Sequence, residues 1–281
     1  MEAVYLPIRA LGDFIITASV IKNYNFEKIP VVLPPYLNDI FKAIEGDKYF
    51  TVIDDIKFAN QPAFFEMYKV KDRKNISRLV KELAVAFRSL NKRNIYLLDY
   101  RSKRLLFTGA KLKWPNIHEN NYRGKYELFS KYFLHNTKQE ASSAIKSDSG
   151  YSKVLIIPDS RIKVKSINEG LIDKIIAKFP NRINLALFGA APAAVKPGVL
   201  FYTNFDQLIA LVNEYDLIIT AESLPYHLAN YYNKPHFVIY NDTRHFKETF
   251  MTPFMIDNNY FFNFTGNNAQ AVIEKLQTII S

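Results

Sequence analysis

Residues 215–240 read YDLIITAESLPYHLANYYNKPHFVIY, and this stretch predicts the fold class more clearly than any other part of the chain. Two short apolar runs, Asp216–Thr220 and Pro235–Tyr240, have the β-branched composition of parallel strands that are covered on both faces. One helix lies between them, with Ser223 suited to its N-cap and Pro225 to its first turn. The stretch therefore predicts a βαβ unit, and the amides that open its helix would bind an anion.

The rest of the chain repeats this alternation of strands and helices, so the pattern predicts an α/β fold. Strands are predicted at Ala3–Ile8, Pro30–Leu33, Phe50–Ile53, Ile95–Leu98, Val154–Ile157, Ile183–Phe188, Val199–Tyr202, Leu217–Thr220 and His236–Tyr240. Helical patterns begin near residues 13, 36 and 77, and the clearest covers 77–90, where leucine or phenylalanine recurs every three or four residues. A polar stretch at about 136–151 indicates a linker between a domain at 1–140 and a domain at 152–281.

Composition limits the class of protein. The chain has 281 residues, of which 48% are hydrophobic and 15% aromatic, enough to bury the cores of two domains and to exclude disorder. Cysteine is absent, which excludes disulfides and thiolate metal sites. The chain enters directly into an apolar strand, and no apolar run reaches membrane-spanning length. We therefore expect a soluble cytoplasmic protein.

Positive charge is concentrated in the first half of the chain. Residues 1–150 hold 25 Lys and Arg against 16 Asp and Glu, a net charge of +9, whereas residues 151–281 hold 12 against 11, a net charge of +1. Such a field attracts nucleic acid, an anionic membrane face or a phosphorylated glycolipid, and the sign of the charge does not choose among them.

Three short motifs follow one another along the chain. The first is Arg9-Ala-Leu-Gly12-Asp13-Phe-Ile-Ile-Thr17, the second is Ile157-Pro-Asp-Ser160-Arg161 with Lys165 just beyond, and the third is Glu222-Ser223-Leu224-Pro225-Tyr226-His227-Leu228-Ala229. In this order they resemble glycosyltransferase family 9, the ADP-heptose:lipopolysaccharide heptosyltransferases. The chain departs from the family at Glu222, where Asp is usual, at Leu224, where Gly is expected, and at Ser166-Ile167, where Trp-Pro is common.

The resemblance implies a GT-B fold, in which two Rossmann-like domains face each other across a central cleft. It also implies inverting transfer of a sugar, with heptose from ADP-heptose as the leading donor, to a bacterial lipopolysaccharide, lipooligosaccharide or capsule-type glycan. We expect the partners to be a nucleoside diphosphate sugar and an anionic glycan or glycolipid, with contact at the inner face of the membrane and no nucleic acid. No cofactor is expected, and no metal, since the chain lacks an Asp-x-Asp sequence.

Asp13 is the predicted catalytic base. Gly12 allows a tight turn after the first strand, and a carboxylate at the carboxyl end of a strand is well placed to take a proton from an acceptor hydroxyl. The resemblance implies the same role, while compensation of the helix dipole is the competing interpretation. We assign Arg9 and Gly12 to the acceptor side, together with Arg101, Lys103 and Arg104, which follow a predicted strand.

The second motif predicts the site of the donor diphosphate. Without a metal, the charge of the leaving group must be stabilised by cations and amides. Lys165 matches the lysine of the family best, and Arg161 and Lys163 are the substitutes. Ser160 would add a hydroxyl or an amide. An ordinary surface cation is the alternative for each of these side chains.

The third motif completes the predicted donor site. Glu222 would accept hydrogen bonds from the sugar, while Ser223 and the amide of Leu224 would hold a phosphate oxygen. His227, in the first turn of the helix, would donate to the leaving phosphate, although a lone helical histidine is usually structural. Gly189 resembles the glycine that the nucleotide base passes, but residues 190–204 contain no Asp or Glu for the ribose. ADP therefore stays open as the nucleotide.

Two alternatives remain. One is another nucleotide sugar as donor, carrying a hexose or an amino sugar, and the other is an inactive, basic protein of the same fold that binds glycan or nucleic acid. A mixed aromatic and basic segment at 57–74 would either rest on a lipid interface or fold inward. No Walker loop, GxGxxG, nucleophile elbow or HExxH occurs, which argues against ATPases, dehydrogenases, hydrolases and zinc proteases.

Overall fold

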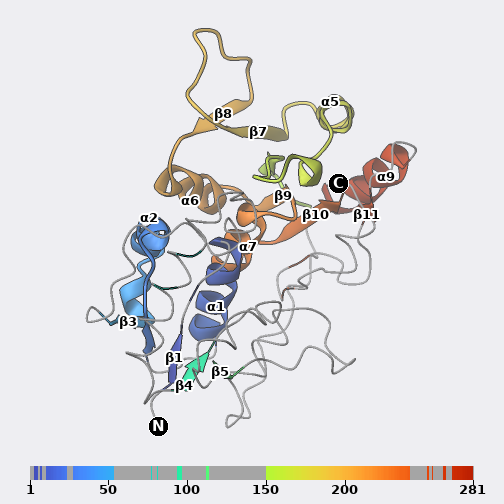
Figure 1. Ribbon diagram of the computed structural model, residues 1–281. Coiled ribbons are helices and arrows are strands. Elements are labelled where there is room, and N and C mark those ends of the chain that lie inside the picture. The colour runs from blue at the N-terminus through green and yellow to red at the C-terminus, as the bar shows by residue number, and fades with distance from the viewer. Residues whose placement is uncertain are drawn as a thin grey trace. The chain divides into compact units, whose positions relative to one another are not determined.

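The structure is a computed structural model, and it describes residues 3–5, 7, 11–23, 28–53, 77, 81, 94–96, 112–113, 150–240, 252, 255, 262–263 and 268–280. The chain divides into two compact units, of which the first comprises residues 1–122 and 128–139 and the second comprises residues 123–127 and 140–281. Each unit has its own sheet (Figure 1). The predicted linker at 136–151 lies almost wholly outside the described residues, so its bounds stay a prediction.

The first unit is built on a parallel sheet with the strand order β3-β2-β1-β4-β5. Its elements are β1 (Ala3–Tyr5), α1 (Leu11–Asn23), β2 (Ile29–Val31), a 3₁₀ helix (Pro35–Leu37), α2 (Asn38–Ala43), a second 3₁₀ helix (Gly46–Lys48), β3 (Phe50–Val52), β4 (Asn94–Tyr96) and β5 (Leu112–Lys113). The order of the strands reverses between β1 and β4. This is the topological switch point, beside which ligands bind in open α/β sheets.

A group of aromatic rings lies in the core of the first unit, among buried aliphatic side chains such as Ile15, Val20 and Val31. The ring of Phe14 on α1 lies 5.3 Å from that of Phe50 and 6.4 Å from that of Tyr5, measured between centroids. Phe41 on α2 joins the group at 6.3 Å from Phe14. A side chain at Gly46 would place its Cβ 2.5 Å from the Phe41 ring, so this glycine is required by close packing.

The second unit carries a longer parallel sheet with the strand order β11-β10-β9-β6-β7-β8. Its elements are β6 (Val154–Ile157), the 3₁₀ helix η5 (Lys163–Lys165), α5 (Glu169–Lys178), β7 (Ile183–Phe188), β8 (Val199–Tyr202), α6 (Phe205–Glu214), β9 (Leu217–Ala221), α7 (Leu224–Tyr231), β10 (His236–Tyr240), β11 (Phe262–Asn263) and α9 (Ala269–Ile280). Here the order reverses between β6 and β9, because β7 and β8 lie on one side of β6 while β9 and β10 lie on the other.

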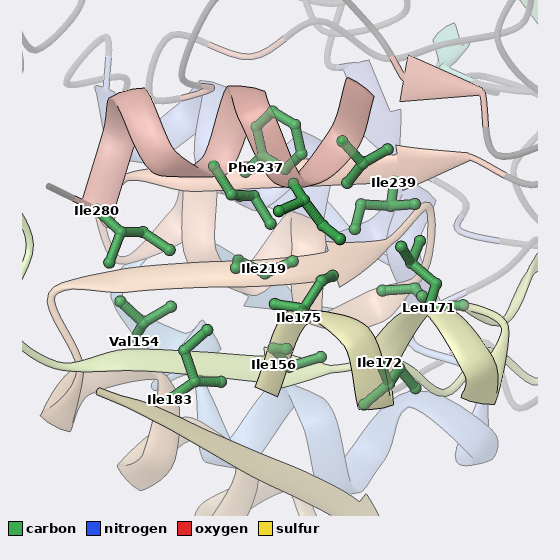
Figure 2. Close-up of a cluster of buried hydrophobic side chains, with 14 of the residues drawn as sticks. Val154, Ile156, Leu171, Ile172, Ile175, Ile183, Ile219, Phe237, Ile239 and Ile280 are labelled. Atoms are coloured by element: carbon green, nitrogen blue, oxygen red, sulfur yellow. The ribbon is translucent and has the colours of Figure 1, made fainter. Parts of the chain in front are cut away.

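Aliphatic side chains form the core of the second unit. Figure 2 shows α5 and α9 covering one face of the sheet, where Ile156, Ile219 and Ile239 point toward them. Strands β6, β9 and β10 are buried along their whole lengths, as the continuous apolar runs in the sequence predict. The guanidinium of Arg182 donates to the carbonyl of Ile280 at 2.7 Å and so ties the last turn of α9 to the loop before β7.

The predicted strands of the second half agree closely with the structure. Those at Val154–Ile157, Ile183–Phe188, Val199–Tyr202 and His236–Tyr240 have the bounds of β6, β7, β8 and β10. In the first half the predicted strand Ala3–Ile8 is too long, because β1 ends at Tyr5. Of the helix predicted at 77–90, only Ser77 and Lys81 are described, and both are helical.

Candidate functional site

The carboxyl ends of β6 and β9 carry the second and third sequence motifs. These two strands pair in parallel, with Ile157 opposite Thr220, so the segments that follow them leave the same edge of the sheet side by side. The switch point of the second sheet lies between these strands. The position is therefore the one at which an open α/β sheet binds its ligand.

Backbone hydrogen bonds fold the loop after β6 into a compact turn. The amide of Ile167 donates to the carbonyl of Pro158 at 3.1 Å, which closes the loop. Inside it, the amide of Ser160 donates to the hydroxyl of Ser166 at 3.0 Å. The loop contains the 3₁₀ helix η5, which ends at Lys165. The fold of the loop therefore fixes the position of the Lys165 backbone.

Lys165 forms an ion pair with Glu222. Its ammonium donates to Oε2 of the carboxylate, and only 20% of the lysine side chain and 9% of the glutamate side chain are exposed. Arg161 and Lys163, in the same loop, are exposed. Because a nearly buried carboxylate is costly without a cation, Lys165 is the cation that Glu222 requires.

Ser223 connects the two segments in a second way. It occupies the N-cap position of α7, but its hydroxyl makes no capping bond to the helix. The hydroxyl instead donates to the carbonyl of Asp159 at 3.2 Å. The predicted N-cap position of Ser223 is therefore confirmed, while its hydroxyl bonds to the loop after β6. Leu224 and Pro225 then open α7 as predicted, with the positive end of the helix dipole at the switch point.

His227 lies within the fold and not on its surface. Only 4% of the residue is exposed, and the ring centroid lies 4.7 Å from that of Tyr226. The predicted contact of His227 with a leaving phosphate stays a prediction.

A second histidine, His236, has a structural role. Its Nδ1 lies 2.8 Å from the carbonyl of Lys234 and its Nε2 lies 2.7 Å from the hydroxyl of Thr252. Burial lowers the pKa of His236 to about 4, so the ring is neutral at physiological pH. With a carbonyl at Nδ1, that nitrogen carries the proton, and Nε2 accepts from Thr252.

Gly189, directly after β7, has a backbone conformation that favours glycine. Its φ is 138°, a region that favours glycine, and an added Cβ would meet no atom within 4 Å. Its amide donates to the carbonyl of Tyr202 at 2.9 Å. The backbone at this strand end is therefore open to a flat ligand.

Asp13 and Gly12 lie in the first turn of α1. The helix begins at Leu11, two residues earlier than the prediction that Asp13 opens it. Asp13 is half-buried, and its carbonyl accepts from the hydroxyl of Thr17 at 3.1 Å. The segment enters from β1, a strand beside the switch point of the first sheet. Arg9, Arg101, Lys103 and Arg104, like the segment 57–74, lie outside the described residues.

Sequence reasoning passed over three residues near this site. Asp159 lies inside the second motif but received no role, and Phe188 and Tyr202 end the strands β7 and β8. The carboxylate of Asp159 accepts from the amide of Phe188 at 3.3 Å. A signal was available, because an acidic residue in an otherwise basic loop directly after a strand is unusual at a site for phosphate.

The described residues suggest neither a metal centre nor a membrane span. Within the described ranges, no three His, Asp or Glu side chains gather as metal ligands. None of the helices in those ranges combines the length and apolar character that crossing a bilayer requires.

Solved glycosyltransferases share this fold over nearly the whole chain. E. coli heptosyltransferase WaaC with ADP-2-deoxy-2-fluoro heptose superposes with a TM-score of 0.61 at 12% identity, covering 99% of each chain. E. coli ADP-heptose LPS heptosyltransferase II gives 0.60 at 14% identity, covering 100% of this chain and 98% of that one. A family 9 glycosyltransferase from Veillonella parvula gives 0.59 at 14% identity, with 99% and 97% covered.

The chain thus has the GT-B glycosyltransferase fold, as predicted. The proteins that share it include two heptosyltransferases and a member of glycosyltransferase family 9, so the predicted resemblance to that family is confirmed at the level of the fold. No protein-family model and no curated protein sequence matches the chain.

Proposed function

We propose that the chain is an inverting, metal-independent glycosyltransferase similar to family 9, which transfers a sugar from a nucleoside diphosphate to an anionic bacterial glycan or glycolipid. Heptose from ADP-heptose is the leading donor, since the structures that share the fold include ADP-heptose enzymes. We place the reaction on the cytoplasmic side of the membrane, where such an acceptor can be reached. Fold alone does not determine chemistry, so the proposal depends on the site.

The ion pair between Lys165 and Glu222 is the observation that carries the proposal. It joins two motifs that are 57 residues apart and places a cation, a carboxylate and a helix N-terminus at one switch point. A diphosphate needs a cation and amide donors, and a sugar needs an acceptor for its hydroxyls. A nucleotide sugar carries both a diphosphate and a sugar. The combination of cation, amides and carboxylate therefore fits a nucleotide sugar better than it fits a diphosphate or a sugar alone.

The proposed chemistry assigns one role to each group. Asp13 takes the proton of the acceptor hydroxyl as that oxygen attacks the anomeric carbon from the face opposite the diphosphate. Lys165 and the first amides of α7 stabilise the negative charge that develops on the departing diphosphate. Glu222 accepts from the hydroxyls of the sugar. The charge of +9 in the first half favours an anionic acceptor, because the donor motifs lie in the nearly neutral half.

Titration with nucleoside diphosphates tests the proposal. Calorimetry with ADP, GDP and UDP should show binding to the wild type, and Lys165→Ala should weaken it by a factor on the order of ten, the loss expected for one charge-assisted hydrogen bond. The same variant should bind the free nucleoside as the wild type does, because the lysine is assigned to phosphate.

Two further variants serve as controls. Arg161→Ala changes an exposed cation of the same loop and should cost less than Lys165→Ala, whereas Lys174→Ala, on the exposed side of α5, should cost nothing. If none of the diphosphates binds, the alternative of an inactive, basic binding protein is favoured. If a diphosphate binds but ADP does not, the donor carries another nucleotide, as the other alternative requires.

A further inference from the structure

The segment after β7 provides no carboxylate for a ribose. The segment after Gly189, residues 190–204, contains no Asp or Glu. Nucleotide-binding α/β folds commonly bind the ribose hydroxyls with such a carboxylate. A site for a ribonucleotide in this chain must therefore take its carboxylate from another element.

Asp159 lies beside that position. It follows β6, which pairs in parallel with β7, and its Oδ2 accepts from the amide of Phe188, the residue before Gly189. Asp159 is half-buried, and within the described part of the chain its carboxylate accepts no other hydrogen bond. The amide thus fixes one oxygen, while the other keeps its capacity to accept from a ligand.

Phe188 adds a flat apolar surface at the same place. Its side chain is 66% exposed, although a large aromatic residue at a strand end is usually covered. Its ring is held at 5.6 Å from that of Tyr202 in an edge-to-face contact. Gly189 leaves the adjacent backbone open, so a planar ligand can reach the ring.

The negative charge of Asp159 also acts on Tyr202. Burial, and then the charge of Asp159, raise the pKa of the Tyr202 phenol to about 12. The phenol therefore stays protonated at physiological pH. The carboxylate of Asp159 and the exposed ring of Phe188 thus gather at the ends of β6 and β7.

The two ends of Asp159 face different strands. Strand β6 lies between β9 and β7. The backbone carbonyl of Asp159 accepts from Ser223 on the β9 side, where Lys165 and Glu222 also meet, whereas the carboxylate of Asp159 accepts from Phe188 on the β7 side. A ligand laid across the end of β6 can place its diphosphate at Lys165 and its nucleoside at Phe188, so the carboxylate does not have to face the phosphates.

We propose that Asp159 and Phe188 form the nucleoside subsite of this protein, in which the carboxylate of Asp159 accepts hydrogen bonds from the ribose 2′- and 3′-hydroxyls and the ring of Phe188 stacks on the base. This inference rests on the proposed function, since it names the nucleoside part of the same donor. It makes Asp159 a specificity-determining residue, which selects ribonucleotides over 2′-deoxyribonucleotides.

Matched nucleotide pairs test the subsite by calorimetry. The wild type should bind at least one of ADP, GDP and UDP about tenfold more tightly than its 2′-deoxy counterpart, the discrimination expected when a hydroxyl that bonds to a charged group is removed. Asp159→Asn should lower this ratio to about twofold or less, because the amide keeps the shape of the side chain but loses its charge. Phe188→Ala should weaken both members of a pair and leave their ratio unchanged.

Asp173→Asn is the matched control, since the same change on the exposed side of α5 should alter neither affinity nor ratio. Equal binding of ribose and deoxyribose forms by the wild type would overturn the subsite while leaving the proposed function standing, and that comparison requires no variant to fold. A ratio that Asp159→Asn does not change would also overturn it. Failure of all six nucleotides to bind would overturn both proposals.

Discussion

The two sheets of this chain are wound in the same way but are held together differently. In the described part of the first unit, the rings of Tyr5, Phe14, Phe41 and Phe50 pack against one another beside buried aliphatic side chains. In the second unit most strands have four to six residues, and isoleucine, valine and leucine fill the space between the sheet and its helices. Each large ring contributes much of the packing energy around it, so the loss of one ring is costly. Where many aliphatic side chains pack together, each contributes a smaller part of the packing energy.

The largest expected effect tests this difference in packing. Phe14→Ala removes a ring that contacts three others and should cost about 4 kcal/mol of unfolding free energy, whereas Ile219→Ala in the second sheet should cost about 3 kcal/mol. Denaturant unfolding followed by fluorescence reports on the first unit, which contains the single tryptophan, Trp114. Circular dichroism reports on both units.

The control for this prediction is Phe188→Ala, which removes the same ring from an exposed position and should change stability by about 0.5 kcal/mol or less. If Phe14→Ala costs no more than this control, the aromatic rings do not hold the first unit together.

The next effect is expected in the second unit and depends on pH. His236 is buried and neutral with a pKa of about 4, below its value of about 6.5 in the unfolded chain, so the unfolded state binds the proton first as pH falls. The stability that this residue contributes should be complete above pH 6.5 and decline toward pH 4, by at most about 3 kcal/mol.

The unfolding free energy measured at pH 7, 6, 5 and 4 checks the prediction for His236. His236→Gln should be less stable at pH 7 but should show a shallower decline over this range. An equal slope in the wild type and the variant would assign the acid sensitivity to other groups.

The third prediction separates catalysis, which is assigned to the switch point of the first sheet, from donor binding, which is assigned to that of the second. Asp13→Asn should lower turnover by a factor on the order of a hundred, the contribution of a general base, while binding of the nucleoside diphosphate stays unchanged. Initial rates and calorimetry on the same preparation separate these quantities. Asp39→Asn, an exposed acid on α2 of the same unit, is the control. Turnover near that of the wild type would remove Asp13 from the mechanism.

The smallest effect concerns the charge at the second switch point. Glu222→Gln neutralises the partner of Lys165, so the lysine becomes available to phosphate and the affinity for a nucleoside diphosphate should rise about fivefold. Glu214→Gln provides a matched control, since Glu214 and Lys153 form an exposed ion pair at 3.9 Å in the same unit. Weaker binding by Glu222→Gln would mean that the carboxylate holds the lysine in the position that phosphate needs.

The sequence predicted the second sheet well for a physical reason. Its strands are mostly apolar runs bounded by proline, glycine, charged or polar residues, so local composition indicates where β6, β7, β8 and β10 begin and end. In the first unit β1 was predicted to be too long, because Leu6 and Ile8 extend the apolar pattern beyond the pairing with β2 and β4.

The site was predicted as separate parts and not as an assembly. The motifs identified Lys165, Glu222 and Ser223 one by one, but nothing local indicates that the lysine pairs with the glutamate or that the serine hydroxyl turns from the helix to Asp159. Both interactions join residues more than 50 positions apart, and they depend on the parallel pairing of β6 with β9. Asp159 received no predicted role, because the role proposed for it depends on β7, the neighbouring strand in the sheet.

The hydrogen bond from Ser223 to the carbonyl of Asp159 has a practical consequence for engineering. With the pair formed by Lys165 and Glu222, it makes the segments at 158–167 and 222–224 a single module supplied by two distant parts of the chain. A chimera that takes one segment from another protein of this fold would leave a nearly buried carboxylate or a lysine without its counterpart. Under the proposed function, donor preference is a property to be transplanted with both segments together, and a library that varies only one of them samples mostly mismatched halves.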